Sequence, residues 1–355
     1  MKAVLLAGGP GTRLRPLTLN TPKPIVPIFD RPFLYHQIDL LQQVPEIDEI
    51  ILSLNYQPDR IKAVVGHGEE TGIRVRYLIE PRPLGTGGAL KFAEPHLDGT
   101  TIVFNGDVLT ETNLSAVVER HRSSNARATI VLSPVDNPSA YGLVETEKDG
   151  SVRRFLEKPD PNQITCDTIS AGIYVLEPST FDRIPPDTKY SIERRYFPSL
   201  IERGETFVAY IDRGYWLDIG TPEKYLQGHR DILEGRCRSE QFPEHIGTRP
   251  TVAAGATVDP SARIDGPCFI GPRATIHAGA TVAPHTVVGR NVIVEPDAAI
   301  HQSIIWPDSH IGEGACLDGT IVGHRCQIGD YAQLGPGLVL GDDSTVTAYT
   351  KTTDV

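Results

Sequence analysis

Residues 3 to 27 read AVLLAGGPGTRLRPLTLNTPKPIVP, and the architecture expected for the N-terminal part of the chain follows from them. The apolar run 3–7 predicts a buried strand of a parallel sheet. It leads into Gly8-Gly9-Pro10-Gly11, where glycine lets the backbone bend sharply and present several N–H groups to an anion. Arg13 and the proline-flanked Lys23 add positive charge that suits phosphate oxygens. The stretch therefore predicts a strand followed by a phosphate-binding loop, although a plain turn with incidental surface charges is the alternative for the loop alone.

Composition and charge limit the class of protein. Of the 355 residues, 39% are apolar and 22% are charged, which is typical of a globular protein. The length of the chain suggests two domains. The net charge of −11 disfavours a nucleic acid or an anionic membrane surface as partner. No apolar run approaches the roughly 18 residues of a membrane span, and the N-terminal run is too short for a signal peptide. The five cysteines form no C-x-x-C pair, so we expect free thiols, no zinc site and a cytoplasmic location.

Strand and helix patterns alternate through the first half of the chain. Such alternation predicts an α/β fold with a Rossmann-like, mainly parallel sheet and helices on both faces. Ligands in such folds bind at the carboxyl ends of the strands. The predicted strands lie at 49–54, 74–79, 101–104 and 127–135, and the predicted helices lie at 32–44, at 59–65 and from 85 onward.

Two loops that follow strands carry candidate site residues. Gly85 and Thr86 lie in the loop 83–88, whose small residues permit the close approach of a base or ribose. A glycine-rich turn into a helix explains the same residues equally well. Asp107 follows the strand 101–104, and a carboxylate at a strand end suits Mg²⁺. An aspartate in this position can also serve only as a turn former.

The opening stretch fits neither common phosphate fingerprint, because it has no G-x-G-x-x-G spacing and no G-K-[ST]. It resembles the signature G-x-G-T-R-x-x-P-L-T followed by P-K-P of the sugar-1-phosphate nucleotidyltransferases. The resemblance implies a loop that wraps the phosphates of a nucleoside triphosphate. The nucleotide-binding residues that it implies are Leu6, Ala7, Gly8, Gly9, Gly11, Thr12, Arg13, Lys23, Gly85 and Thr86.

Two further motifs match the metal-binding elements of that family. Asp107 lies in an [ND]-x-D motif, and Asp218 lies in the segment 214–222, which resembles [FY]-W-x-D-[IV]-G-x-P. The resemblance implies that both carboxylates bind Mg²⁺, although they lie about 110 residues apart and spacing alone cannot pair them.

The sugar-phosphate side is implied by the motif F-x-E-K-P at 155–159. Glu157 would accept hydrogen bonds from sugar hydroxyls, and Lys158 would neutralise the sugar phosphate. On an extended strand these side chains face opposite ways, so both reach one ligand only if the chain turns there. Ser170 stands where the family usually has Asn, which leaves sugar recognition open. The full set implied for this substrate is Gly142, Glu157, Lys158, Ser170 and Gly172.

Beyond residue 250, an apolar residue recurs every six positions, usually two positions after a small residue. This hexapeptide pattern predicts a β-helix, and its resemblance to hexapeptide-repeat proteins implies the left-handed parallel form with about five coils. The repeated positions are Val252, Val258, Ile264, Ile270, Ile276, Val282, Val288, Val294 and Ile300, then Ile305, Ile311 and Leu317, then Val322, Ile328, Leu334, Leu340 and Val346.

Some hexapeptide proteins are acyltransferases that use a histidine, and this tail has five histidines. Residues 251–355 hold five Lys and Arg against eleven Asp and Glu, which does not suit an anionic coenzyme. We therefore expect the tail to serve assembly or regulation. The histidines are His277, His285, His301, His310 and His324.

The motifs and the repeats together predict a catalytic domain at 1–235, a linker at 236–250 and a left-handed β-helix at 251–355. The combination resembles the GDP-mannose pyrophosphorylase branch of the family. It implies a Mg²⁺-dependent in-line attack of mannose 1-phosphate on the α-phosphate of GTP and a homo-oligomer that assembles through the β-helix. The catalytic residues that it implies are Arg13, Lys23, Asp107, Lys158 and Asp218.

Two alternatives stay open at this point. One keeps the reaction but uses glucose 1-phosphate with dTTP or UTP. The other is a catalytically silent regulatory subunit that binds nucleotide sugars. The presence of all five implied catalytic residues speaks against the second alternative.

Overall fold

The computed structural model describes residues 1–238 and 248–352, and these form two compact units. The first unit contains Met1–Gly9 and Gln37–Trp216, and the second contains Pro10–His36 and the chain from Leu217 onward. The predicted phosphate loop therefore begins in the first unit and continues in the second. Residues 239–247 of the predicted linker lie outside the described residues, and the predicted boundaries at 235 and 251 stay a prediction.

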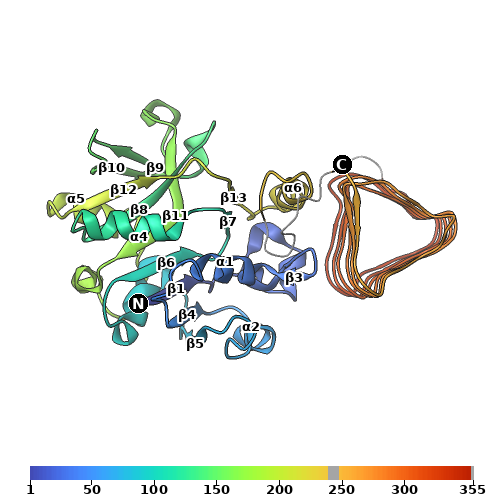
Figure 1. Ribbon diagram of the computed structural model, residues 1–355, viewed down its shortest axis with the longest axis horizontal. Helices are drawn as coiled ribbons and strands as arrows, with labels where there is room; N and C mark the ends of the chain where they lie inside the picture. Colours follow the sequence, from blue (N-terminus) through green and yellow to red (C-terminus); the bar gives the residue numbers. More distant parts are fainter. Residues whose placement is uncertain (239–247, 353–355) are drawn as a thin grey trace. The chain divides into compact units, whose positions relative to one another are not determined.

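A nine-stranded sheet forms the framework of the first unit (Figure 1). Its strand order is β10-β9-β11-β6-β1-β4-β5, and β8 pairs with β11 and β12. Strand β1 (Lys2–Leu6) lies in parallel between β4 (Glu49–Leu54) and β6 (Thr101–Asn105). The mainly parallel α/β arrangement is confirmed, with β11 antiparallel to β6. The other strands are β5 (Arg74–Ile79), β8 (Ala128–Pro134), β9 (Gly142–Thr146), β10 (Val152–Glu157), β11 (Thr168–Leu176) and β12 (Phe207–Ile211).

Helices follow several of these strands. The predicted helices are present as α1 (Phe33–Leu41), α2 (Pro58–Val65) and α3 (Gly85–Ala93). Two others, α4 (Leu114–Ser123) and α5 (Phe197–Glu202), had no counterpart among the predicted elements. The alternation of strands and helices brings the carboxyl ends of β1, β4 and β6 to one edge of the sheet.

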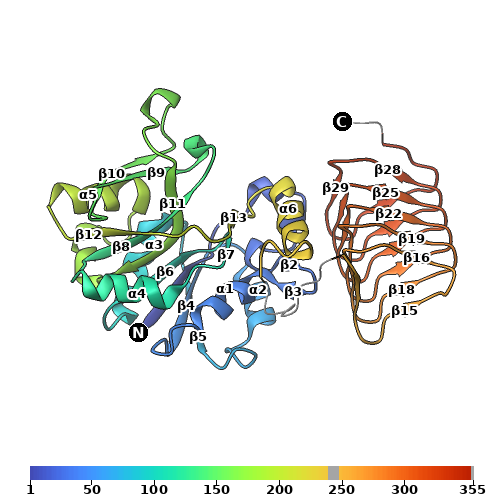
Figure 2. The ribbon, with the colours of Figure 1, turned by 45° about the horizontal axis from the view of Figure 1, so that its top comes forward.

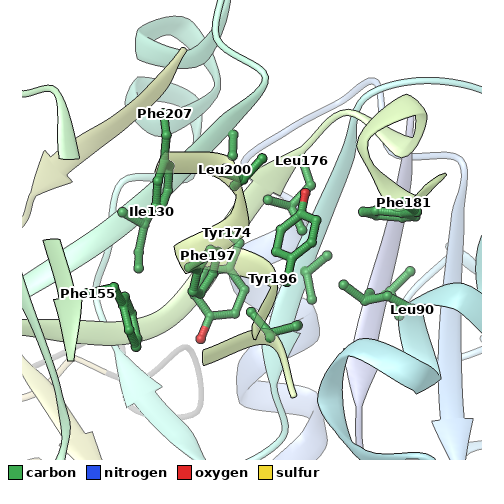
Figure 3. Close-up of a cluster of buried hydrophobic side chains, with 14 of the residues drawn as sticks. Leu90, Ile130, Phe155, Tyr174, Leu176, Phe181, Tyr196, Phe197, Leu200 and Phe207 are labelled. Atoms are coloured by element: carbon green, nitrogen blue, oxygen red, sulfur yellow. The ribbon is translucent and has the colours of Figure 1, made fainter. Parts of the chain in front are cut away.

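Aromatic side chains hold the antiparallel part of the sheet to α5 (Figure 3). The ring of Phe197 lies 5.1 Å from Phe155, 5.0 Å from Tyr174 and 5.2 Å from Phe207, measured between ring centroids. These three partners come from β10, β11 and β12. One buried cluster therefore fixes the strands that carry Glu157 and Ser170, and aromatic pairs of this kind add to the stability that burial gives.

Seventeen short parallel strands of the second unit stack into three sheets of six, six and five strands (Figures 1 and 2). Seen along the stack, the coils form a triangle, as in a left-handed β-helix (Figure 1). The predicted repeat is confirmed, because each strand contains one of the predicted apolar positions. The strands are β14 (Pro250–Val252), β15 (Thr257–Val258), β16 (Arg263–Ile264), β17 (Cys268–Ile270), β18 (Thr275–Ile276), β19 (Thr281–Val282), β20 (Val287–Val288), β21 (Ile293–Val294), β22 (Ala299–His301), β23 (Ile304–Ile305), β24 (His310–Ile311), β25 (Cys316–Asp318), β26 (Ile321–Val322), β27 (Gln327–Ile328), β28 (Gln333–Leu334), β29 (Val339–Leu340) and β30 (Thr345–Val346).

The hexapeptide period follows from the narrow interior of the triangle. At the repeat positions from Ile270 to Leu334 the apolar side chain is buried, and the small residue two positions earlier leaves room for it, as with fully buried Ala274 and Ala298. The two shifts of the repeat occur where a coil is one residue shorter. There, the hydroxyl of buried Ser303 accepts a hydrogen bond from the Thr320 N–H at 3.0 Å, so this backbone donor keeps a partner in the shorter coil.

Besides the β-helix, the described part of the second unit contains helix α6 (Pro222–Leu233) and the segment 10–36, which we call loop 10–36 although its last four residues begin α1. The loop contains the short strands β2 (Pro27–Ile28) and β3 (Arg31–Pro32). Thr221 caps α6, accepting a hydrogen bond from the Lys224 N–H at 3.4 Å. Strand β13 (Trp216–Asp218) carries the chain from the first unit into the second, and β7 (Val108–Thr110) belongs to the first. None of the helices within residues 1–238 and 248–352 has the length and apolar character to traverse a membrane.

Candidate active site

Three cationic side chains surround the carboxylate of Asp218 in the second unit. Arg13 Nη1 lies 3.6 Å from Oδ2, Lys23 Nζ lies 3.9 Å from Oδ1, and Lys224 Nζ lies 4.0 Å from Oδ2. The predicted residues Arg13, Lys23 and Asp218 are therefore brought together. The local charge of three cations and one anion is +2, which suits a polyphosphate in a chain whose net charge is −11.

Lys224 is a site residue that the sequence analysis missed. It lies in the first turn of α6, six residues after Asp218, so its ammonium returns toward the carboxylate. A lysine at the start of a helix is ordinary in sequence, and a cation there is unfavourable to the helix dipole. This unfavourable interaction with the helix dipole was the signal in the sequence that could have pointed to Lys224.

Close backbone packing holds this cluster. Gly11 adopts a left-handed conformation with φ 59°, and a Cβ there would lie 3.1 Å from both Lys23 Cβ and Thr18 Cγ2. At Gly220, a Cβ would lie 2.6 Å from Arg13 Nη2 and from Asp218 Oδ1. Glycine at 11 suits the left-handed backbone, and glycine at both positions leaves room for the charged side chains to approach, in addition to any role in presenting N–H groups.

The carboxylate of Asp218 fits a hard divalent cation. Its Oδ1 is buried and accepts no hydrogen bond, which is rare for a buried carboxylate oxygen. Mg²⁺ binds such oxygens and needs only one or two protein carboxylates beside the phosphates of a substrate. No group of three or more His, Cys, Asp or Glu residues within the described ranges could hold a metal by itself.

In the first unit, the loop 105–107 is pressed against the end of β1. The Gly106 N–H donates to the Leu6 carbonyl at 3.1 Å, and a Cβ at Gly106 would lie only 2.7 Å from that oxygen. Ala7 is held on the other side, its N–H donating to the Ser53 carbonyl at 3.0 Å. Asp107 is thereby fixed beside the first residues of the predicted nucleotide loop.

Glu80 is a second residue that the sequence analysis missed. It follows β5, it is 7% exposed, and its Oε1 would lie 3.3 Å from a Cβ placed on Gly8. Its Oε1 accepts from Ser53 Oγ at 2.8 Å, and its Oε2 accepts from the Leu84 N–H at 2.9 Å. A buried carboxylate therefore lies between the loop at Gly8 and the loop that leads to Gly85. A single acidic residue after a strand gave no signal in the sequence.

The glycine-rich turn at 85–88 is explained largely by packing inside the protein. The N–H groups of Gly87 and Gly88 donate to the Tyr190 carbonyl at 2.9 and 3.2 Å. Gly85 has φ 70°, and a Cβ there would lie 2.8 Å from the same oxygen. Thr86 Oγ1 donates to Glu193 Oε2 at 2.9 Å and accepts from the Ile192 N–H. The Thr86 hydroxyl is thus engaged by the protein, and its role toward a nucleotide stays a prediction.

Glu157 and Lys158 lie where β10 ends. Lys158 has φ 51°, so the chain leaves the extended conformation there. The side chains of Glu157 and Lys158 therefore need not face opposite sides, as they would on an extended strand. Gly142 pairs with Glu157 across the ladder, and a Cβ on it would lie 2.7 Å from the ring of Phe155. Burial, followed by repulsion from Glu193, raises the pKa of Glu157 above its usual range. A carboxylate held in this way gains from a hydrogen-bond donor such as a sugar hydroxyl.

Ser170 and Gly172 lie on β11 beside Asn105. The Ser170 hydroxyl and the Tyr174 hydroxyl are 3.2 Å apart, and Asn105 Nδ2 donates to Tyr174 at 3.5 Å. Gly172 has φ 78°, and a Cβ there would lie 3.1 Å from Asn105 Nδ2. Asn105 Oδ1 is buried and has no hydrogen-bond partner, which is uncommon for a buried amide oxygen. Asn105 and Tyr174 were not among the predicted residues.

The predicted residues thus fall into two groups. Gly8, Asp107, Glu157 and their neighbours belong to the first unit, whereas Gly11, Thr12, Arg13, Lys23 and Asp218 belong to the second. Each group is held in place by contacts within its own unit. The pairing of Asp107 with Asp218 stays a prediction.

Known proteins share both parts of this organisation. Residues 2–235 match the nucleotidyl transferase family model, and residues 264–351 match the model of the GMPPB C-terminal domain. Mannose-1-phosphate guanyltransferase of Debaryomyces hansenii is 39% identical over 350 residues, which are 97% of this chain and 91% of that protein. Mannose-1-phosphate guanylyltransferase of Mycobacterium tuberculosis is 40% identical over 267 residues, 74% of this chain and 73% of that protein.

Solved structures resemble the catalytic part. The crystal structure of HddC from Yersinia pseudotuberculosis has a TM-score of 0.56 and 32% identity, and the match covers 64% of this chain and 97% of HddC. HddC complexed with GMP-PN gives a TM-score of 0.55 and 33% identity over 64% of this chain and 96% of HddC.

Proposed function

This chain belongs to the nucleotidyl transferase family, and from that membership we propose that it is a mannose-1-phosphate guanylyltransferase. The family expected from the sequence motifs is confirmed. In the proposed reaction, mannose 1-phosphate and GTP give GDP-mannose and pyrophosphate. The observation that carries the chemistry is the cluster of Arg13, Lys23 and Lys224 around Asp218. The substrates are proposed from the names of relatives that match almost the whole chain.

The nucleotide side of the reaction is a displacement at the α-phosphorus. An oxygen of the sugar phosphate attacks in line and forms the new P–O bond, while the bond between the α-phosphorus and the bridging oxygen breaks. Pyrophosphate leaves with the bonding electron pair, so negative charge develops on it. Arg13 is 60% exposed and can follow this charge, whereas Lys23 is 11% exposed and fixed. A prepositioned cation such as Lys23 stabilises the transition state without reorganisation.

The sugar side of the site positions the nucleophile. Lys158 would hold the phosphate of mannose 1-phosphate, and Glu157 would accept hydrogen bonds from sugar hydroxyls. The unpartnered Asn105 Oδ1 offers a further acceptor beside Gly172. Holding both substrates in this way turns a reaction between two anions into one within a single complex.

Enzymes of this family generally use Mg²⁺, and Asp107 and Asp218 are the residues that would hold it here. When bound, Mg²⁺ supplies neutralisation of the phosphate oxygens. The proposal further includes a homo-oligomer that assembles through the β-helix and a cytoplasmic location, where both substrates would be available.

Glu80 supports the choice of guanine. The carboxylate accepts one hydrogen bond on each oxygen, and a carboxylate has about four acceptor positions, so both oxygens keep capacity. Guanine presents adjacent N1–H and N2–H donors, which match two carboxylate oxygens. Uracil and thymine present one N–H flanked by carbonyls, which a carboxylate would repel.

Pyrophosphate release measured with Mg²⁺ over a grid of nucleoside triphosphates and sugar 1-phosphates tests the proposal. We expect the highest kcat/KM for GTP with mannose 1-phosphate. Preference for dTTP or UTP with glucose 1-phosphate would replace the proposed substrates. No release from any pair would identify the chain as a silent regulatory subunit.

A further inference from the structure

One corner of the β-helix carries a row of residues that differs from the other corners. The residue directly after strands β17, β20, β23, β26 and β29 is glycine in four coils and tryptophan in the middle coil. We call this set the corner row; its members are Gly271, Gly289, Trp306, Gly323 and Gly341. A Cβ on Gly271 would lie 2.9 Å from Asp30 Oδ2, and a Cβ on Gly341 would lie 3.2 Å from Pro16. Two members of the corner row, Gly271 and Gly341, therefore lie against loop 10–36 within the second unit.

Near the last coil, a carboxylate joins the loop to the β-helix. Asp342 Oδ2 accepts a hydrogen bond from Thr21 Oγ1 at 2.8 Å, and its Oδ1 accepts from the His324 N–H at 3.0 Å. Thr21 is 6% exposed and lies two residues before Lys23. Asp342 therefore links a coil of the β-helix to the segment that presents a phosphate-binding lysine.

In the middle coil, Trp306 links both elements that converge on the Asp218 cluster. Its Nε1–H donates to the Tyr225 hydroxyl at 2.9 Å, and that hydroxyl donates to the Pro27 carbonyl. Tyr225 lies in α6, seven residues after Asp218, and Pro27 lies four residues after Lys23. Trp306 is 1% exposed, so this chain of hydrogen bonds is shielded from water.

Near the first coils, the end of the loop is held in the same way. Asp30 Oδ1 accepts from the Arg290 N–H at 3.1 Å. The ring of Phe29 lies 5.4 Å from that of Phe269, and its N–H donates to His229 Nε2 at 3.1 Å. The loop is thus attached to the β-helix at three heights along one corner.

We propose that the β-helix is a positioning element of the active site. The corner row and Asp342 hold loop 10–36 so that Arg13 and Lys23 remain beside Asp218 when the triphosphate binds. Asp342 and Trp306 are accordingly positioning residues that act through Thr21 and Tyr225. The identification of the triphosphate as ligand rests on the proposed function, whereas the attachment of the loop does not.

A matched pair of variants of the full chain tests the proposal. Asp330 follows Gly329 as Asp342 follows Gly341, and its Oδ1 accepts the Glu313 N–H at 3.0 Å, the same contact that Asp342 makes to His324. Asp342→Ala loses this bond and the bond to Thr21, whereas Asp330→Ala loses only the bond within the β-helix.

Two measurements separate the attachment from its consequence. Hydrogen exchange without substrate should show faster exchange of the amides in 11–28 for Asp342→Ala and no change there for Asp330→Ala. In pyrophosphate release, Asp342→Ala should raise KM for GTP roughly tenfold while KM for mannose 1-phosphate stays the same, because the loop that contacts only one substrate is loosened. Thr21→Val should reproduce both effects, and Thr21→Ser, which keeps the donor, should restore the wild-type values.

Each result bears on the proposal. Unchanged exchange in Asp342→Ala and Thr21→Val would refute the attachment. Faster exchange with an unchanged KM for GTP would refute the positioning role. If Asp342→Ala and Asp330→Ala had equal effects, the bond between Thr21 and Asp342 would have no specific role, and both effects would reflect the general stability of the coils. A wild-type enzyme without turnover would refute the proposed function, and hydrogen exchange would still decide the attachment. If Asp342→Ala does not fold, Thr21→Val and Thr21→Ser carry the test.

Discussion

In the first unit, the candidate site residues follow strands whose neighbours form continuous backbone ladders, such as β1 between β4 and β6. In the second unit, Arg13 and Lys23 lie on a loop whose supports come from far along the chain. Thr21 bonds Asp342 across 321 positions, Asp30 bonds Arg290 across 260, and Pro27 bonds Tyr225 across 198. The first group is therefore held by the sheet itself, and the second is held by an independent structural element.

This difference separates two ways of losing activity. A residue of the first group is disturbed only by changes near the sheet, because each strand is fixed by its own ladder and by the cluster around Phe197. A residue of the second group can be disturbed by a change in the β-helix. We therefore expect changes in the repeat domain to affect the triphosphate side of the proposed reaction more than the sugar side.

The largest expected effects are direct losses from each group. Lys23→Ala and Asp107→Ala should each lower kcat about a hundredfold or more, as the loss of a main electrostatic stabiliser does. Lys62→Ala is a suitable control, because this lysine lies on α2 and its two surface contacts, an ion pair with Asp59 and a position 6.0 Å from the ring centroid of Tyr77, contribute little. Initial rates of pyrophosphate release at saturating substrates give the comparison. Near-wild-type turnover in either site variant would remove that residue from the catalytic group.

Glu80→Gln should change base selection and leave the loop of the second unit unaffected. We expect kcat/KM for GTP to fall about tenfold to a hundredfold, because an amide cannot accept both guanine donors. ITP lacks the 2-amino group, so its kcat/KM should fall much less. The ratio of the two values is the measurement, since general damage near Ser53 and Leu84 would lower both equally. An unchanged GTP to ITP ratio would contradict a role for Glu80 in reading guanine.

The contrast also explains how far the sequence could predict this molecule. The strand ends, the place of Asp107 just after β6 and the hexapeptide coils were predictable, because periodicity and motifs are local signals, whereas the role of Asp107 stays a prediction. Glu80 and Lys224 were not, because each is an ordinary residue that becomes distinctive only through its neighbours in space. The attachment of Thr21 to Asp342 was beyond prediction for the same reason. In the sequence, a glycine of the corner row predicts only a turn, and its packing against Pro16 or Asp30 is visible only in the structure.

Trp306→Phe sharpens the comparison between the groups. The ring is kept, but Tyr225 loses its hydrogen-bond donor at 2.9 Å, which costs about 1–2 kcal/mol when the group is buried. We expect KM for GTP to rise about threefold to fivefold, because part of this free-energy cost should weaken the hold of loop 10–36 on the triphosphate. Phe197→Leu is the matched change in the core of the first unit and should lower the melting temperature without changing KM for GTP. The opposite pattern would show that the β-helix does not support the triphosphate side.

The smallest expected effect is a pH dependence of stability at Asp30. Burial raises the pKa of Asp30 to about 6, against the opposing effects of the Arg290 N–H and the charges of Arg290 and Arg273. In the unfolded chain the value is about 3.9, so between about pH 4 and pH 6 the folded protein keeps a proton that the unfolded chain loses. The carboxylate therefore lowers stability as pH rises through this window, and the loss is complete above about pH 6.

Asp30→Asn removes this titration while its amide oxygen can still accept from the Arg290 N–H. The variant should match the wild type near pH 4 and exceed it at pH 8 by about 1–2 kcal/mol, since the side chain is only partly buried. Urea unfolding of the full chain at both pH values measures the difference. Asp259→Asn is the control of opposite sign. Hydrogen bonds from Ser261 lower the pKa of Asp259, so the ionised carboxylate stabilises the folded protein. Removing this carboxylate should therefore destabilise the protein above pH 4. If Asp30→Asn lowers stability at pH 8, the ionised carboxylate itself attaches the loop to the β-helix, and the contact with Arg290 is a charged one.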